Sequence, residues 1–157
     1  MRWEEIYKRL LFLFLFLNLA GCSTSSVKVE KPVEKSSIET EKTSMKLFIN
    51  EQEIPVIWEN NKTVKEFMEE VNRKDIVVSM SMYSNNEQVG SLGRSYSKKD
   101  TYMTTHNGDI VLYNASNIVL FYGSNSWDYT KLGKMDLSKQ EVIDLLSNGN
   151  VRITITK

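Results

Sequence analysis

No cluster of residues in this 157-residue chain identifies a nucleophilic or acid–base reaction. Cys22 is the only cysteine and His106 the only histidine. A lone thiol provides neither a disulfide framework nor a cysteine-based zinc site. A catalytic histidine needs a nucleophile and an orienting carboxylate, but His106 lies in the turn-forming sequence Thr-His-Asn-Gly-Asp, with only Asp109 close along the chain. We therefore predict that His106 lies in a loop or hairpin and that the protein uses no metal and no cofactor.

Residues suited to binding are easier to nominate. Trp127 and Tyr129 alternate along the chain, and a strand would place both rings on one face of a sheet. There they would either line a ligand groove or fill the end of a barrel. Glu87 follows a short polar turn at residues 84–86, so its carboxylate could accept hydrogen bonds from loop amides or from a ligand. Both alternatives stay open for the aromatic pair and for Glu87.

The surroundings of Cys22 indicate where the protein works. The unbroken apolar run at residues 10–17 is much shorter than the roughly 20 residues that cross a bilayer as a helix. It follows a start with three basic and two acidic residues, and once extended past Asn18 it ends in the small residues Ala20 and Gly21, which is typical of a secretory signal. Leu19-Ala20-Gly21-Cys22 resembles the lipobox of bacterial lipoproteins, which implies a signal peptide at residues 1–21 and lipidation of Cys22, with fatty acids such as palmitate. The alternatives are a plain signal peptide and an uncleaved anchor.

Composition divides the rest of the chain into a stalk and a domain. Residues 22–44 would comprise the acylated cysteine and a flexible stalk, because the segment has no aromatic residue and balanced Lys and Glu; a partner-binding motif is the alternative. Aromatic residues return at residues 45–157, a segment of the size of one domain. With 20 Lys and Arg against 20 Asp and Glu, the chain is not suited to nucleic acid. We predict localisation at the extracytoplasmic face of a bacterial cell membrane, with that membrane and a peptide or protein ligand as partners.

Alternation of apolar and polar residues predicts several strands in the domain. The ranges are 45–50 with 53–58 for a first hairpin, 75–83 for a central strand, 109–113 with 118–122 for a second hairpin, and 151–157 for a last strand. The polar stretch at residues 84–107 is too long for a structureless loop, so we expect short strands or a functional loop in it.

Two helices are predicted between these strands. Thr63 with Glu66 has the spacing of a capping box for a helix within residues 60–72, and Ser138 with Glu141 has it for one within residues 136–150. Six or more strands and two well-separated helices predict a mainly β fold, a closed or nearly closed β-barrel capped by helices, because closure removes exposed strand edges. A compact α+β sandwich is the alternative.

The amino-acid sequence of one stretch resembles that of a known protein family. GDIVLYNASNIVLFYGSNSWDYTKLGKM, residues 108–135, is similar to small bacterial cyclophilin-like domains, in which a Gly-Asp-Ile strand leads through a hairpin to a Leu-Phe-Tyr-Gly strand and then to a Leu-Gly-Lys segment before a helix. YSNNEQVGSL, residues 83–92, fits as well. The resemblance covers residues 45–157 and implies a cyclophilin-like β-barrel with a helix over each end.

The resemblance implies less about activity. Cyclophilins isomerise X-Pro bonds with an arginine beside an apolar pocket, but their Phe-His-Arg and Gln-Gly-Gly-Asp strings do not occur here. By neighbourhood, Arg94 would be the catalytic stand-in, with Tyr83, Met82 and Phe121 as pocket walls; an exposed, solvated Arg94 is the alternative. Three functions stay open: a peptide- or small-ligand-binding module, a divergent peptidyl-prolyl isomerase acting on exported proteins, and an accessory or structural lipoprotein.

Overall fold

A computed structural model describes residues 45–157, a mainly β domain with two helices. The predictions for residues 1–44, lipidation at Cys22 included, lie outside the described residues. The strands are β1 (Lys46–Ile49), β2 (Gln52–Ile54), β3 (Val56–Trp58), β4 (Ile76–Ser79), β5 (Ser81–Tyr83), β6 (Glu87–Ser91), β7 (Thr101–Thr104), β8 (Asp109–Tyr113), β9 (Asn117–Phe121), β10 (Ser126–Met135) and β11 (Arg152–Thr156). The helices are α1 (Lys62–Val71) and α2 (Lys139–Leu146). Within residues 45–157, neither helix is long and apolar enough to span a membrane.

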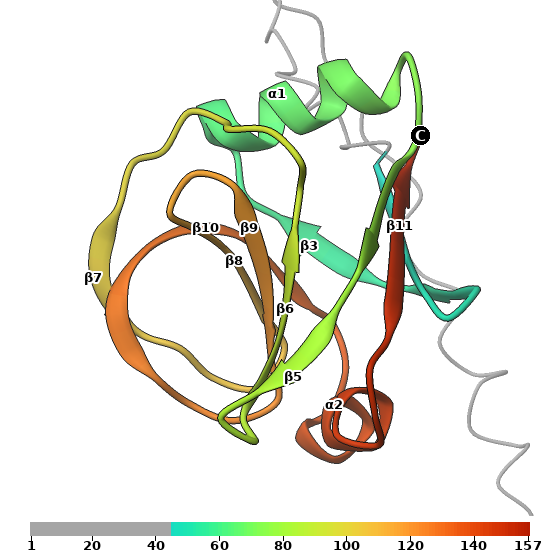
Figure 1. The fold of residues 1–157 in the computed structure, drawn as a ribbon, viewed down its shortest axis with the longest axis vertical. Coiled ribbons are helices and arrows are strands. Elements are labelled where there is room, and N and C mark those ends of the chain that lie inside the picture. The colour runs from blue at the N-terminus through green and yellow to red at the C-terminus, as the bar shows by residue number, and fades with distance from the viewer. Residues whose placement is uncertain (1–44) are drawn as a thin grey trace, which may run out of the picture. The chain divides into compact units, whose positions relative to one another are not determined.

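The strands pair antiparallel in two sheets (Figure 1). One sheet has the order β2-β1-β11-β4, and the other has the order β3-β10-β8-β9-β6-β5. The long strand β10 curls, so that its first residues pair with β7 while later residues pair with β8 and β3. The helices α1 and α2 lie at opposite ends of the strands (Figure 1). The prediction of a mainly β fold with two helices is therefore confirmed.

The chain passes from one sheet to the other at two breaks that the sequence patterns did not reveal. Residues 53–58, predicted as one strand, are divided at Pro55 into β2 and β3. Proline has no N–H to donate to a ladder, which favours a break in the strand at this position. The Pro55 carbonyl accepts a hydrogen bond from Asp136 N, which follows β10 in the other sheet. Residues 75–83 are divided at Met80 into β4 and β5, and Met80 N donates to Val151 O. The prediction of a single strand was wrong at both places.

The closed barrel is not confirmed, because backbone pairing among the described strands leaves the two sheets separate. They come together through packing instead, and they approach closely where β6 passes β4 at Gly90. A Cβ atom added to Gly90 would lie 2.4 Å from Val78 Cγ1 and 2.5 Å from Met80 Sδ. The absence of a side chain at Gly90 thus lets one sheet lie against the other without hydrogen bonds between them.

Tight turns fix the register of three hairpins. Consecutive residues with positive φ lie at Asn50 and Glu51, at Ser84 and Asn85, and at Asn114 and Ala115. Two such residues in a row are the hallmark of the type I′ turn, whose twist matches that of paired strands. The hairpins predicted around residues 50–52 and 114–117 are confirmed, and the polar stretch at residues 84–107 contains the expected short strands, β6 and β7.

The start of α1 differs from its prediction. The N-cap is Asn61, whose Oδ1 accepts a hydrogen bond of 3.0 Å from Val64 N. The predicted box of Thr63 and Glu66 does not form, because both side chains bind Ser97 in the segment that follows β6. A polar helix end can be capped by more than one neighbouring residue, and here the tertiary partner decides which one.

Both ends of α2 are fixed, its start as predicted. Ser138 and Glu141 form the capping box, each accepting from the other's backbone N–H. At its other end, the buried Gln88 side chain donates hydrogen bonds of 2.7 Å to Leu146 O and to Gly149 O. This satisfies carbonyl groups that a helix terminus leaves unpaired and joins α2 to β6.

Apolar side chains form two clusters on opposite faces of the larger sheet. The main core draws residues from both sheets and both helices. Alternate residues of β8 and β9 point the other way and build a smaller cluster, which β7 and the first half of β10 approach. This smaller cluster consists of Val111, Val119, Phe121 and Tyr129, with Val89, Met103 and Tyr113 packed against it.

Candidate functional site

A cavity of about 400 Å³ lies over the smaller cluster, within the size range of small-ligand sites. It is built by β5, β6, β8, β9 and the beginning of β10. Aromatic and aliphatic side chains predominate in its lining, with one carboxylate among them. The lining residues are Tyr83, Glu87, Val89, Tyr113, Val119, Asn125, Trp127 and Tyr129.

Strand register places the first part of this lining. Tyr83 in β5 pairs with Glu87 in β6, which in turn pairs with Phe121 in β9, so that the three form one row across the sheet. Two residues further along, Val89 pairs with Val119 and forms the next row on the same face. The turn between β5 and β6 therefore determines which side chains reach the cavity.

The curled strand β10 supplies the aromatic side of the cavity. Trp127 and Tyr129 both line it, as their alternation predicts for one face of a strand. The Tyr129 ring is buried and meets the rings of Phe121 and Tyr113 edge-on, with centroids 5.7 Å and 5.9 Å away. Its hydroxyl accepts a hydrogen bond from Asn125 Nδ2 at 2.9 Å. Tyr129 is thus held rigidly, whereas Trp127 is 56% exposed at the cavity.

Glu87 is the electrostatic feature of the site. The residue is only 7% exposed, and its Oε2 atom has no hydrogen-bond partner among the described residues. Burial raises the pKa of Glu87, because the cavity replaces the water that would solvate its charge. No Lys, Arg or His side chain is part of the described lining. The cavity therefore contains an unsatisfied carboxylate surrounded by aromatic rings.

The neighbouring Asn86, not Glu87, organises the turn before β6. The Asn86 carbonyl accepts hydrogen bonds from Tyr122 N and Gly123 N, at 2.9 Å and 2.8 Å. Its side-chain Nδ2 donates to Ser124 O at 3.1 Å. The loop amides are therefore satisfied by backbone and by Asn86, and the carboxylate of Glu87 is left to line the cavity.

Arg94 lies in the segment between β6 and β7 and is not one of the residues that line the cavity. Its Nη1 atom is 3.1 Å from Glu70 Oε2 in α1, and its guanidinium carbon is 4.8 Å from the centroid of the Tyr96 ring. The side chain is half exposed. The structure thus does not bring Arg94 together with Tyr83 and Phe121, and its catalytic role remains a prediction.

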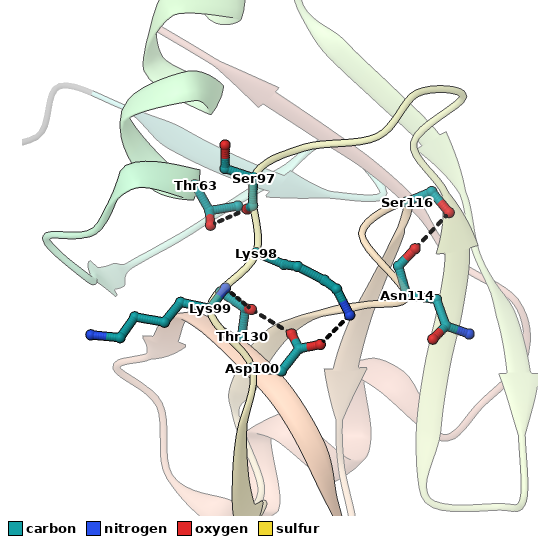
Figure 2. Close-up of polar contacts among 8 residues, drawn as sticks. All are labelled: Thr63, Ser97, Lys98, Lys99, Asp100, Asn114, Ser116 and Thr130. Carbon is teal, nitrogen blue, oxygen red and sulfur yellow. Dashed lines mark hydrogen bonds and ion pairs between the residues drawn. The ribbon is translucent and has the colours of Figure 1, made fainter.

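The segment that carries Arg94 is held by hydrogen bonds to both neighbouring elements (Figure 2). On one side, Thr63 Oγ1 in α1 donates to Ser97 O at 2.6 Å. On the other side, Lys99 N donates to Thr130 Oγ1 at 2.8 Å, and that hydroxyl donates to Asp100 Oδ1 at 2.7 Å. These contacts give the segment a structural role in joining α1 to β10.

Four of the five residues nominated for ligand binding, Tyr83, Glu87, Trp127 and Tyr129, line one cavity. The fifth, Phe121, is fully buried behind Tyr129. Sequence reasoning missed the remaining lining residues. Alternation from Glu87 would have indicated Val89, and alternation from Phe121 would have indicated Val119, but Tyr113 and Asn125 required the register and the curl of β10. These four missed residues are Val89, Tyr113, Val119 and Asn125.

The chemistry open to the site is that of binding through aromatic faces and a carboxylate. Within residues 45–157, no three His, Cys, Asp or Glu side chains are grouped so that they could hold a metal ion. His106 is exposed in the loop between β7 and β8, and its backbone N–H donates to Asp109 Oδ2 at 2.8 Å.

Comparison with known proteins agrees with the resemblance seen in the sequence. A family model described as the cyclophilin-like family matches residues 47–156. No curated protein and no solved structure matches the chain.

Proposed function

The chain belongs to the cyclophilin-like family, and from that premise we propose that its domain is a binding module for a peptide or small ligand. The aromatic cavity carries this proposal. Tyr83 and Trp127 expose 63% and 56% of their surface at its entrance, while Val119 and Tyr129 are buried within it. Exposed aromatic rings beside a preformed apolar cavity supply rigid contact area at little entropic cost.

Binding fits this cavity better than isomerisation does. Stabilising a twisted prolyl amide requires a positioned donor, in cyclophilins an arginine, directed into an apolar cleft. The lining of the cavity among residues 45–157 contains no basic side chain, and the guanidinium of Arg94 is engaged by Glu70. The two alternative functions are a divergent peptidyl-prolyl isomerase and an accessory lipoprotein, and the binding experiment described below distinguishes them from a binding module.

We also propose that lipid attached to Cys22 holds the module at the outer face of a bacterial membrane. Its support is the sequence Leu19-Ala20-Gly21-Cys22 after an apolar run too short to span a bilayer. In cells fed labelled palmitate, we expect label in the wild-type protein and none in Cys22→Ala, which should also leave the membrane fraction. Equal labelling of the two proteins would contradict the anchor.

Ligand binding is tested with the full chain in a neutral detergent and a panel of capped tetrapeptides. The panel varies one position through proline, aromatic, aliphatic, acidic and basic side chains, and binding is followed by NMR chemical shifts. Val89→Trp would fill the cavity with a bulky ring. Val77→Trp is the matched control, because Val77 is 47% exposed on β4 in the other sheet.

We expect at least one peptide to bind the wild type and Val77→Trp but not Val89→Trp, with no change in the rate of cis/trans exchange. Faster X-Pro exchange that disappears in Arg94→Ala would make the protein an isomerase. Absence of binding to every peptide would exclude the peptide as ligand, and absence of binding to small ligands as well would favour the accessory role.

A further inference from the structure

Glu87 indicates which chemical class of ligand would suit the cavity. It is more than nine-tenths buried, it lines the cavity, and its Oε2 atom accepts no hydrogen bond from the part of the chain that the structure describes. This oxygen is shielded from water and has gained no hydrogen bond from the described residues in exchange, so the charge of the carboxylate is only partly compensated. A bound molecule that donates an N–H to the Glu87 carboxylate from the cavity would compensate this charge, and a charged donor makes the stronger bond.

The rest of the lining favours the same sign of charge. Four of the eight lining residues are aromatic, and an aromatic face attracts a cation that lies within about 6 Å of the ring centroid. Val89 and Val119 add apolar surface that suits a hydrocarbon stem. A carboxylate and aromatic faces both repel an anion. The four aromatic residues are Tyr83, Tyr113, Trp127 and Tyr129.

We infer that the cavity binds a primary ammonium group on an apolar stem, carried by a small alkylamine or by the lysine side chain of a peptide, with Glu87 as its counter-ion. The inference rests on the proposed function, that this cavity binds a ligand, and adds the ligand's chemistry. A quaternary ammonium group has no N–H to donate to the carboxylate, and a neutral alkyl group would leave the carboxylate unpaired. Both are therefore expected to bind more weakly.

Binding of this kind depends on pH through Glu87. Burial raises the pKa of Glu87 above its ordinary 4.5, and an ammonium ion favours the ionised carboxylate, so affinity rises as pH increases through the range above 4.5. The titratable side chains facing Glu87 are Tyr83 from β5, Tyr113 from β8, Tyr129 from β10 and Tyr122 after β9. Burial and the nearby Glu87 raise the pKa of Tyr122 and of Tyr129, so neither hydroxyl ionises across that range.

The test titrates the full chain, in a neutral detergent near pH 7, with four probes. These are n-butylammonium, N-acetyl-lysine N-methylamide, N-acetyl-norleucine N-methylamide and butyltrimethylammonium. Binding is read from the backbone amide shifts of Glu87 and Val89. Glu87→Gln removes the charge and keeps the shape, while Glu53→Gln removes a half-exposed carboxylate from β2 in the other sheet. The unfolding midpoint of each variant confirms that it is folded.

We expect both primary ammonium probes to bind the wild type and Glu53→Gln, and to bind Glu87→Gln more weakly by about tenfold or more. The norleucine and trimethylammonium probes should be weaker by a similar factor with the wild type. Tighter binding of the lysine probe than of butylammonium would identify a peptide as the source, and equal binding a small amine.

Three results would overturn the inference: no binding of either primary ammonium probe, unchanged affinity in Glu87→Gln, or norleucine binding as tight as that of lysine. If the norleucine probe binds and Val89→Trp abolishes its binding, the cavity is a ligand site of another chemistry. In that case the proposed function stands while the inferred ligand class fails.

Discussion

Two buried glutamates of this domain differ in what surrounds them. Glu70 in α1 is 5% exposed, and its carboxylate accepts a hydrogen bond of 2.6 Å from the Tyr96 hydroxyl and pairs with Arg94 and Lys74. Glu87 in β6 is 7% exposed, and its Oε2 atom has no partner among residues 45–157. The two residues are therefore almost equally exposed to solvent, but they differ in the hydrogen-bond and ion-pair partners of their carboxylates.

Because of these partners, the pKa values of the two glutamates shift in opposite directions. Burial acts to raise the pKa of Glu70, but the Tyr96 hydroxyl, Arg94 and Lys74 outweigh it, so its pKa lies below the ordinary value. Burial of Glu87 is not opposed, so its pKa is raised. A satisfied buried carboxylate indicates a structural joint, here between α1 and the segment that carries Arg94. An unsatisfied one beside a cavity indicates a binding group.

The largest expected effect is the loss of the satisfied carboxylate. Glu70→Ala leaves the buried Tyr96 hydroxyl without its acceptor, so we expect the free energy of unfolding to fall by about 2–4 kcal/mol. Urea unfolding of the full chain, followed by tryptophan fluorescence, measures this. A change smaller than about 0.5 kcal/mol would show that the joint does not contribute to stability.

Removing the unsatisfied carboxylate should act in the opposite direction. Glu87→Gln keeps the shape of the side chain but removes a buried charge that has no partner among the described residues. We expect the free energy of unfolding near pH 7 to be unchanged or to rise by up to about 1 kcal/mol. The same urea titration applies. A clear loss of stability would mean that Glu87 has a structural role, and the contrast with Glu70 would disappear.

Arg94→Ala should have a smaller effect than Glu70→Ala. The arginine side chain is half exposed, so solvent screens its pairing with Glu70, and Tyr96 and Lys74 remain as partners of the carboxylate. We expect a loss of about 0.5–1 kcal/mol, including the contact of the guanidinium with the Tyr96 ring. A loss as large as that of Glu70→Ala would show that the ion pair, and not the tyrosine hydroxyl, holds the joint.

The smallest effect is a dependence on pH that separates the two carboxylates. The folded-state pKa of Glu87 lies above 4.5, so its charge destabilises the fold at higher pH and this cost disappears as pH falls through the range above 4.5. The folded-state pKa of Glu70 lies below 4.5, so its stabilising contribution is present above 4.5 and is lost as pH falls below it.

Stability profiles of the wild type and two variants between pH 7 and pH 3 measure both contributions. Relative to Glu87→Gln, the wild type should gain stability on acidification from pH 7 towards 4.5. Relative to Glu70→Gln, it should lose stability below 4.5. Parallel profiles for the three proteins would contradict the assignment of opposite shifts.

Local signals in the sequence predicted local structure well. The capping box of Ser138 and Glu141 lies within four residues, and the turn at Asn114 and Ala115 joins neighbouring strands, so both could be found from spacing alone. Trp127 and Tyr129 share a face because alternation in a strand is a property of the backbone.

Predictions failed where a distant partner decides the outcome. Thr63 and Glu66 have the spacing of a capping box, yet both bind Ser97, which lies more than thirty residues away along the chain. Arg94 was nominated from its neighbourhood, and its contact with Glu70 depends on how α1 packs against the segment after β6. No periodicity encodes contacts of this kind, because they are set by the tertiary arrangement.

The position of β1 has a mechanical consequence. The chain enters the described domain at Met45 and continues at once into β1, which pairs with β2 on one side and β11 on the other. A pull directed along β1 would act perpendicular to its backbone hydrogen bonds. Extraction would then require shearing both ladders at the same time instead of peeling one bond after another. A strand paired on both sides is thus harder to extract than a strand at the edge of a sheet.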